Sequence, residues 1–205
     1  MFDSGITAKD LINEVKSEVD VALPIPNASY VTWLNSLEQF LYSSIIREQS
    51  KVTVTNPTGM TVELSDLVMD GNEAPIRFDD VYTVYADSTQ LIKTNVASGQ
   101  VFTNCYYRYN NDLAFAYSVA DRPDNLIIVY YIKPALKSVD DNDEVTGGNV
   151  MVPVEFIELV KSKLRAEAYM VENEYTPAAN WMNNYNALLE NFKQWLSERA
   201  AQFGM

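Results

Sequence analysis

The sequence predicts an α+β protein: a four-helix bundle of two N-terminal and two C-terminal helices that carries an inserted antiparallel β-sandwich or small barrel. Apolar residues recur every three or four positions in residues 1–50 and again in residues 151–205, which indicates amphipathic helices. In residues 51–137 the apolar positions alternate, which is the period of a strand. We therefore expect the two ends of the chain to form one helical body, with residues 138–150 as an acidic linker back to it.

The first N-terminal helix is expected over residues 6–19, and the second carries its apolar stripe over residues 31–46, with Asn27 or Ser29 available to cap its start. Thr7 and Asp10 have the spacing of a capping box, and the apolar positions that follow repeat by three and four. The connector at residues 23–26 contains two prolines, and each biases the residue before it away from helical geometry. The two helices can therefore pack as a hairpin.

The middle of the chain reads as a series of short strands. The alternating runs lie at 52–55, 60–64, 81–86, 90–96, 101–109, 113–119 and 126–133. The turn signal at residues 56–59 predicts a hairpin between the first two strands, and residues 65–74 read as a loop. Residues 126–132 are apolar on both alternating faces, which places this strand in the centre of the sheet or under the helices.

The acidic linker does not match a calcium loop. An EF-hand that began at Asp140 would need glycine at its sixth position and glutamate at its twelfth, where this chain has Val145 and Met151. We therefore expect a solvated turn at Asp140–Glu144.

The C-terminal helices carry the widest apolar stripes. Pro153 opens the first of them, and Thr176 followed by Pro177 marks the start of the second. The last helix repeats apolar residues by three and four, with two tryptophans widening its stripe. The two helices are expected to pair.

Composition excludes several classes of function. The chain has 205 residues, which fits one large domain or two small ones, and a net charge of −13, which disfavours general binding to nucleic acid or to anionic membranes. It has no histidine and one cysteine, so most catalytic triads, cysteine-cluster metal sites and internal disulfides are excluded. The longest apolar run, 126–132, is too short to cross a bilayer. We expect no cofactor, no metal, no membrane association and no enzymatic activity.

Two candidate sites in the strand region have ordinary structural explanations. Asp79 and Asp80 are adjacent, so in a strand they would point to opposite faces rather than act together on a glycoside. A tyrosine-rich cluster has three possible uses, namely sheet core, sugar stacking or a protein interface. Its candidate contact residues are Tyr107, Tyr109, Phe115 and Tyr117.

The order of motifs resembles the head-to-tail adaptor proteins, also called connector or neck proteins, of tailed bacteriophages. The likeness begins with Thr7–Ile12 and Trp33–Asn35, which resemble the helix and W-[IL]-N opening of that family. Val129–Pro134 is similar to its aromatic, basic and proline strand end, which precedes an acidic spacer. Val152–Phe156 resembles its [IV]-P-x-x-[FL] entry into an alanine- and tyrosine-bearing helix, here Ala166–Tyr169.

The resemblance implies a structural protein of the virion neck, assembled in the cytoplasm of the bacterial host. It would form a homo-oligomeric ring, with a dodecamer as the expected form, between the phage portal protein and a tail or nozzle protein. DNA would pass through the ring during ejection without being bound specifically. The negative charge agrees with this role, because a conduit that held phosphates would obstruct passage.

We expect the last helix to dock on the portal, because its aromatic residues exceed what one neighbouring helix covers. The candidate portal-binding residues are Trp181, Tyr185, Phe192, Trp195 and Phe203. The tyrosine-rich strands would then face the next subunit or the tail. Two alternatives stay open: a carbohydrate-binding or adhesin module, which the tyrosine-rich strands favour, and a baseplate or tail-terminator component, which differs only in the ring it contacts.

Overall fold

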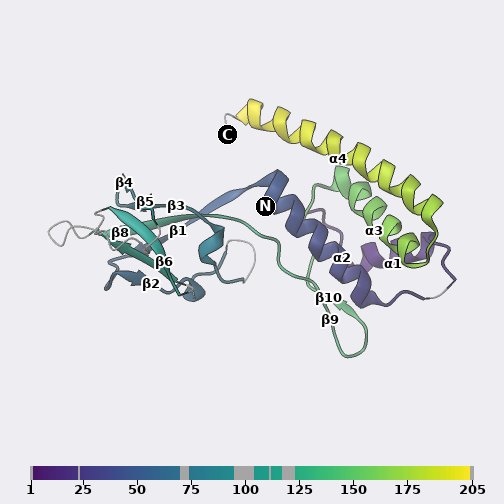
Figure 1. Cartoon of the computed structure of the whole chain (residues 1–205), viewed down its shortest axis with the longest axis horizontal. Coiled ribbons are helices and arrows are strands. Elements are labelled where there is room, and N and C mark those ends of the chain that lie inside the picture. The colour runs from purple at the N-terminus through teal and green to yellow at the C-terminus, as the bar shows by residue number, and fades with distance from the viewer. Residues whose placement is uncertain are drawn as a thin grey trace. The chain divides into compact units, whose positions relative to one another are not determined.

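A computed structural model describes residues 2–22, 24–69, 74–94, 104–110, 112–116 and 123–203, with side chains through residue 201. The chain forms two compact units, an α-helical unit of residues Met1–Ile46 and Pro134–Met205 and a β unit of residues Arg47–Lys133 (Figure 1). The fold class is α+β, as the sequence predicts.

Helix α1 (Ala8–Glu18) begins where the sequence predicts a cap. The Thr7 hydroxyl accepts the Asp10 backbone N–H at 3.1 Å, which satisfies one of the unpaired donors at the helix start. Helix α2 (Asn27–Phe40) starts after Pro26 and continues into a single π-helical segment, Leu41–Ile46. Helix α1 lies close to its predicted bounds, but the cap predicted for α2 is wrong, because Asn27 and Ser29 both lie within the helix and Pro26 at its N-cap forms no side-chain hydrogen bond.

Helix α3 (Ile157–Val171) follows a 3-10 turn at Val154–Phe156, and helix α4 (Tyr175–Phe203) follows after a short turn. Asn173 adopts a left-handed conformation in this turn, with φ of 61°, as is common for asparagine at a helix C-terminus. Helix α4 begins before the predicted start at Thr176, because the N–H of Ala178 already bonds to the Glu174 carbonyl at 3.1 Å. Pro177 still lies in the first turn, where its missing donor costs nothing.

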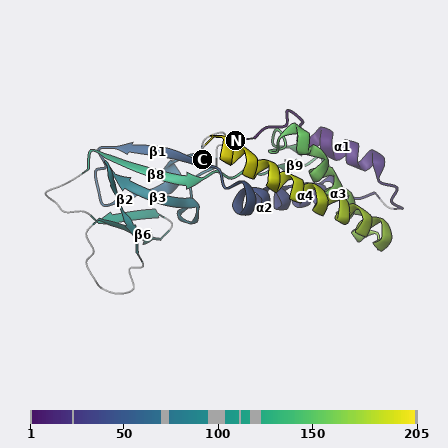
Figure 2. The same cartoon turned by 90° about the horizontal axis from the view of Figure 1, so that it is seen from above.

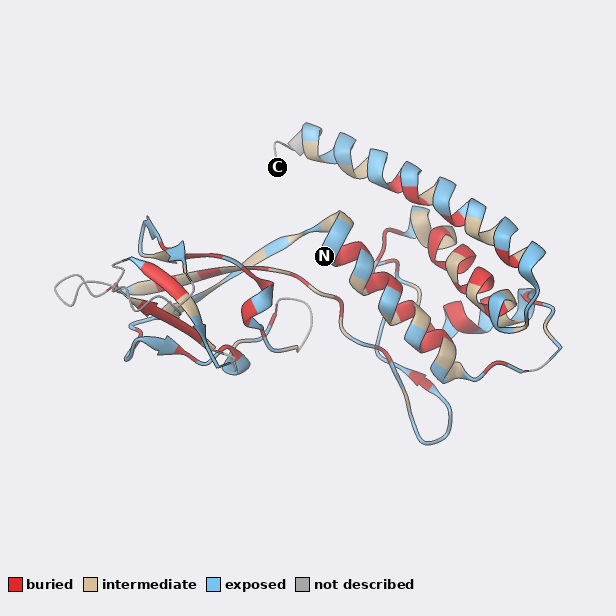
Figure 3. Cartoon of the chain, viewed as in Figure 1, coloured by how far each residue is buried: buried red, intermediate tan, exposed pale blue. Residues whose placement is uncertain are grey.

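One hydrophobic core joins all four helices. Leu11, Leu34, Leu159 and Phe192, one from each helix in order, are fully buried within it. The buried residues of the helices lie on their inward sides, and α4 runs along α3 in both views (Figures 1, 2 and 3). The structure thus gives four helices around a shared core, and their arrangement as a regular four-helix bundle stays a prediction.

The first sheet of the β unit has the order β1 (Gln49–Thr55), β8 (Asn125–Tyr131), β3 (Val81–Ala86), β4 (Thr89–Gln90), and every pairing in it is antiparallel. The central position predicted for residues 126–132 is confirmed, because β8 lies between β1 and β3. Leu126, Ile128 and Tyr130 alternate along β8 and are fully buried on one face of the sheet. The residues between them on β8 are half-buried, so the other face of the strand is also partly covered.

The second sheet has the order β2 (Thr61–Val62), β7 (Asp112–Ala116), β6 (Cys105–Tyr109), β5 (Ile92–Lys93). Two predictions are corrected here. Strand β5 pairs parallel to β6, so this sheet is mixed rather than antiparallel, and among the described residues neither sheet closes into a barrel. The predicted run 90–96 divides into β4 and β5 around the buried Leu91.

The predicted hairpin across residues 56–59 is wrong, because β1 pairs with β8 and β2 pairs with β7. The turn therefore carries the chain from one sheet to the other. Pairing with β8 sets Val52 and Val54 opposite the apolar Ile128 and Leu126 over a seven-residue strand, which the two-residue β2 could not match. The loop expected at 65–74 contains a 3-10 turn at its start, Leu64–Asp66, and its residues 70–73 lie outside the described part of the chain.

Residues 138–150 contain more structure than a linker. Strands β9 (Ser138–Val139) and β10 (Val145–Thr146) form a hairpin in the α-helical unit. The Asp140 carboxylate accepts the backbone N–H groups of Asn142 and Glu144, each at 2.9 Å, and so builds the tip of the hairpin. At Gly147, with φ of 109°, a Cβ atom would lie 2.7 Å from the Cα of Lys137, so the close approach of the two strands requires glycine.

Candidate contact surfaces

The aromatic stripe of α4 is largely covered. Phe192 is fully buried, with its ring centroid 4.8 Å from that of Phe156 in the 3-10 turn before α3. Trp195 lies against Phe156 at 5.4 Å and against Phe2 of the N-terminal segment at 5.7 Å. Tyr185 is also buried in the core. The aromatic rings that one neighbouring helix would not cover are therefore covered by two further segments of the same chain, the N-terminal segment and the 3-10 turn before α3.

Trp181 lies over a cluster of charged residues that joins three helices. The Arg165 guanidinium on α3 is 4.4 Å from the Trp181 ring centroid and pairs with Glu18 of α1 and Glu158 of α3. Lys161, one helical turn earlier, pairs with Glu14 of α1. The pKa of Arg165 is raised because its two carboxylate partners outweigh the effect of burial. The periodicity of the sequence gives no sign of this cluster.

The predicted portal-binding residues thus lie at different depths. Tyr185 and Phe192 are buried, Trp181 and Trp195 are half-buried, and the side chain of Phe203 is outside the described residues. The exposed face of α4 is polar and rich in amides. It includes Asn183, Asn186, Glu190, Asn191 and Gln194. The surface that α4 offers to a partner therefore includes these polar side chains, the edges of the two tryptophans and Tyr175 at the start of the helix.

An apolar tip lies where α3 turns into α4. Met170, Val171 and Tyr175 are all exposed, and the Tyr175 hydroxyl donates to the Asn173 side chain at 2.9 Å. Val171 continues the predicted apolar stripe of α3, but the helix ends there and no described segment covers it. Exposed apolar side chains in a group are typical of contact surfaces.

The tyrosine-rich strands divide their aromatic residues between two faces. Phe115 lies opposite Tyr106 in the pairing of β6 with β7, and both are buried. Tyr107 is half-buried, Tyr109 is exposed, and both lie on the other face of β6. Tyr117 is outside the described residues. Of the four predicted contact residues, Phe115 belongs to the core and Tyr107 and Tyr109 are accessible.

The β unit carries a second aromatic group that the sequence analysis did not find. The rings of Tyr82 and Tyr131 are 5.4 Å apart, and Arg47 lies over Tyr131 and donates to its hydroxyl at 2.8 Å. Tyr82 is exposed. These residues come from β3, the end of β8 and the segment before β1, so their proximity follows from the sheet order rather than from any local pattern.

The resemblance motif Trp33–Asn35 has a structural role in this chain. The Asn35 side chain donates to the Lys137 carbonyl at 2.8 Å and accepts the Lys137 N–H at 2.9 Å. One turn further along α2, Glu38 pairs with the Lys137 ammonium, and both side chains are buried. Glu38 also accepts the Met151 N–H at 2.7 Å. Helix α2 thereby fixes both ends of the segment that leads from the β unit to α3.

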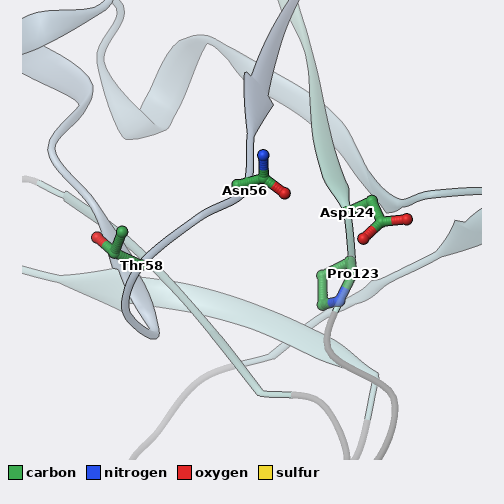
Figure 4. Close-up of a pocket in the computed structure, with 4 residues that line it drawn as sticks. All are labelled: Asn56, Thr58, Pro123 and Asp124. Carbon is green, nitrogen blue, oxygen red and sulfur yellow. The ribbon is translucent and has the colours of Figure 1, made fainter.

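A surface recess of about 360 Å³ in the β unit is lined by Asn56, Thr58, Pro123 and Asp124 (Figure 4). The Asn56 N–H donates to the Asp124 carbonyl at 2.7 Å across its edge. Within the described ranges, no three His, Cys, Asp or Glu side chains are placed to hold a metal ion. In the same ranges, no helix is both long and apolar enough to span a membrane.

The exposed apolar and aromatic groups on both units are typical of a structural protein that binds other proteins. The family model of the SU10 adaptor protein matches residues 6–203. The chain therefore belongs to this family of phage head-to-tail adaptor proteins, and the resemblance seen in the sequence is confirmed. Such an adaptor is a component of the virion that interacts with other head and tail components, and structural adaptors are in general not enzymes. No curated protein matches the chain.

Proposed function

We propose that the protein forms a homo-oligomeric ring between the portal and the tail of a phage particle, and that the ring serves as a conduit for DNA without catalysing a reaction. The observation that carries this proposal is the family match over residues 6–203, which covers both units of the chain. A dodecamer is the proposed form, with assembly in the host cytoplasm. Residues 1–50 and 151–205 would form the rigid body of the ring as a four-helix bundle, and residues 51–137 a contact module.

The charge of the chain supports passage of DNA without retention. Acidic residues outnumber basic ones by 28 to 15. Many of the basic side chains are engaged in ion pairs within the chain, namely Lys9, Arg108, Lys133, Lys137, Lys161, Lys163, Arg165 and Lys193. A cation that is already paired gains less from a phosphate, so the affinity for DNA is expected to be low even at low salt.

We further propose that α4 contacts the portal through its C-terminal end, which includes Phe203, and through the accessible edges of Trp181 and Trp195. Tyr185 and Phe192 would act indirectly, because their burial holds α4 against α3. In the β unit, Tyr107 and Tyr109 would contact the next subunit or the tail, with Tyr117 extending the same contact. Phe115 would support that surface from within the core.

Electron microscopy of portal rings with and without the purified protein tests this proposal. We expect additional density at the narrow end of the portal with the full chain, and none with a variant that lacks residues 197–205. This truncation leaves Trp195 and its contacts with Phe2 and Phe156 intact. A variant that lacks residues 195–205 also loses those contacts, so comparing the two separates docking from folding.

Three results would contradict the proposal at different points. Portal density that persists without residues 197–205 would place the docking surface elsewhere on the chain. Density on isolated tails but not on portals would favour a tail-terminator component. A full chain that binds neither would remove the ring proposal altogether, provided that its circular dichroism is that of a folded α+β protein.

A further inference from the structure

Strand β1 is one of the two edge strands of the first sheet. It pairs with β8 over seven residues, from Gln49 opposite Tyr131 to Thr55 opposite Asn125, without a register shift. Among the described residues, no strand lies on its other side. Within that part of the chain, the backbone groups on this edge of β1 have no strand partner.

The direction of the backbone groups follows from two hydrogen bonds at the ends of the pairing. The Ile132 N–H donates to the Glu48 carbonyl at 2.9 Å, and the Asn56 N–H donates to the Asp124 carbonyl at 2.7 Å. In an antiparallel pair the bonded residues alternate, so the even-numbered residues of β1 bond to β8. Gln49, Lys51, Thr53 and Thr55 consequently direct their N–H and C=O groups away from the sheet.

This edge lacks the features that usually prevent strands from pairing. Natural edge strands are short, contain proline or several charges, or bend away at a bulge. Strand β1 has neither proline nor a bulge, and Lys51 is its one charged residue. Val52 and Val54 are half-buried, so a strand added here would cover apolar surface as well as form main-chain hydrogen bonds.

The strand that best fits this edge is another β1. The other terminal strands of the two sheets are β2, β4 and β5, and each has two residues. Each could therefore bond to only some of the outward N–H and C=O groups of β1. In an antiparallel arrangement with Thr53 opposite Thr53 of a second copy, Val52 lies opposite Val54 and Lys51 lies opposite Thr55. Valine and threonine pairs stabilise such sheets, and no like charges face each other. A parallel arrangement in the same register would bring the two Lys51 side chains together.

We propose that two copies of the free protein associate through β1, with a two-fold axis at Thr53, so that the two four-stranded sheets become one continuous sheet. This goes beyond the proposed function, because a two-fold contact closes at two copies and does not build a ring. In this proposal, two copies of the protein contact each other through the β1 edge before they join the particle.

Amide hydrogen exchange of the full chain tests the contact without a mutation. Between micromolar and millimolar protein, the amides of Lys51 and Thr53 are expected to become protected as the dimer forms. The amides of Val52 and Val54 bond to β8 in either state and should stay protected throughout. Unchanged exchange of Lys51 and Thr53, together with a monomeric mass by sedimentation at the highest concentration, overturns the proposal.

A matched pair of variants tests the register. Thr53→Pro removes an outward N–H and leaves the bonds to β8, whereas Thr53→Ala keeps the N–H. We expect Thr53→Pro to raise the dimer dissociation constant about tenfold or more relative to Thr53→Ala, since two hydrogen bonds are lost per dimer. Equal dimerisation of the two variants overturns the pairing, and if Thr53→Pro does not fold, the exchange experiment alone decides.

Discussion

Asn35 and Lys137 form two hydrogen bonds with each other, although Asn35 precedes the β unit in the sequence and Lys137 follows it. The Asn35 amide donates to the Lys137 carbonyl at 2.8 Å, and the Lys137 N–H donates to the Asn35 side-chain oxygen at 2.9 Å. One side chain on α2 thus acts towards the returning segment as a neighbouring strand would. Because backbone groups that lose a partner away from water are costly, this pair is a sensitive point of the α-helical unit.

Replacing Asn35 by alanine is expected to lower the free energy of unfolding by about 1–3 kcal/mol, because both backbone groups of Lys137 lose their partner. Urea denaturation followed by circular dichroism measures the change. Asn183→Ala, on the exposed face of α4, is the matched control and should change the free energy by no more than about 0.5 kcal/mol. Equal effects of the two substitutions would show that the pair does not stabilise the fold.

Phe192 should behave as a core residue. Phe192→Ala is expected to lower the free energy of unfolding by about 3–5 kcal/mol, because the ring is fully buried against Phe156 and Trp195. Phe40, exposed on α2, provides a control of the same residue type, and Phe40→Ala should cost about 0.5 kcal/mol or less. A small loss at Phe192 would mean that α4 does not pack on α3 as described.

Two carboxyl groups of the α-helical unit are expected to titrate in opposite directions. Burial raises the pKa of Glu38 above its ordinary value of 4.5, with Lys137 opposing part of the rise. Its contribution to stability is therefore full below pH 4.5 and is lost as the pH rises through the raised pKa. Backbone hydrogen bonds from Glu144 and Asn142 lower the pKa of Asp140 below 3.8, so its contribution is present above that pH and is lost as the pH falls through the lowered pKa.

Carbon-detected NMR titration of the side-chain carboxyl groups checks both directions in one sample. The midpoint of Glu38 should lie above 4.5 and that of Asp140 below 3.8. A Glu38 midpoint at or below 4.5 would contradict the burial of the pair that Glu38 forms with Lys137.

Local signals in the sequence predicted local structure well. Thr7 caps α1 because the hydroxyl of an N-cap threonine can reach the backbone N–H three residues later, here that of Asp10. The two apolar faces of residues 126–132 predict a strand in the centre of the sheet or under the helices, and β8 lies in the centre, between β1 and β3. The choice of partner was not predictable in the same way. The turn at 56–59 satisfied every local rule for a hairpin, but β8 offers β1 a longer and more apolar partner from far along the chain.

The contact surfaces were predicted less well for a related reason. The stripe of Tyr185, Phe192 and Trp195 was visible from its spacing, but its cover by Phe2 and Phe156 depends on where the N-terminal segment and the 3-10 turn lie in space. The hydrogen bonds of Asn35 and the ion pair of Glu38 leave no periodic pattern in the sequence. Each involves a single polar residue whose partner is distant in sequence. Spacing identifies which side chains share a face, and tertiary structure decides what covers them.

The hydrogen bond between Ile132 and Glu48 means that the polypeptide enters and leaves the β unit at neighbouring points. A segment with adjacent ends can be exchanged, lengthened or removed with only a short peptide to rejoin the flanking chain, at little entropic cost to the remainder. The β unit can accordingly be excised and the flanking segments rejoined, while the α-helical unit keeps a hydrophobic core of its own.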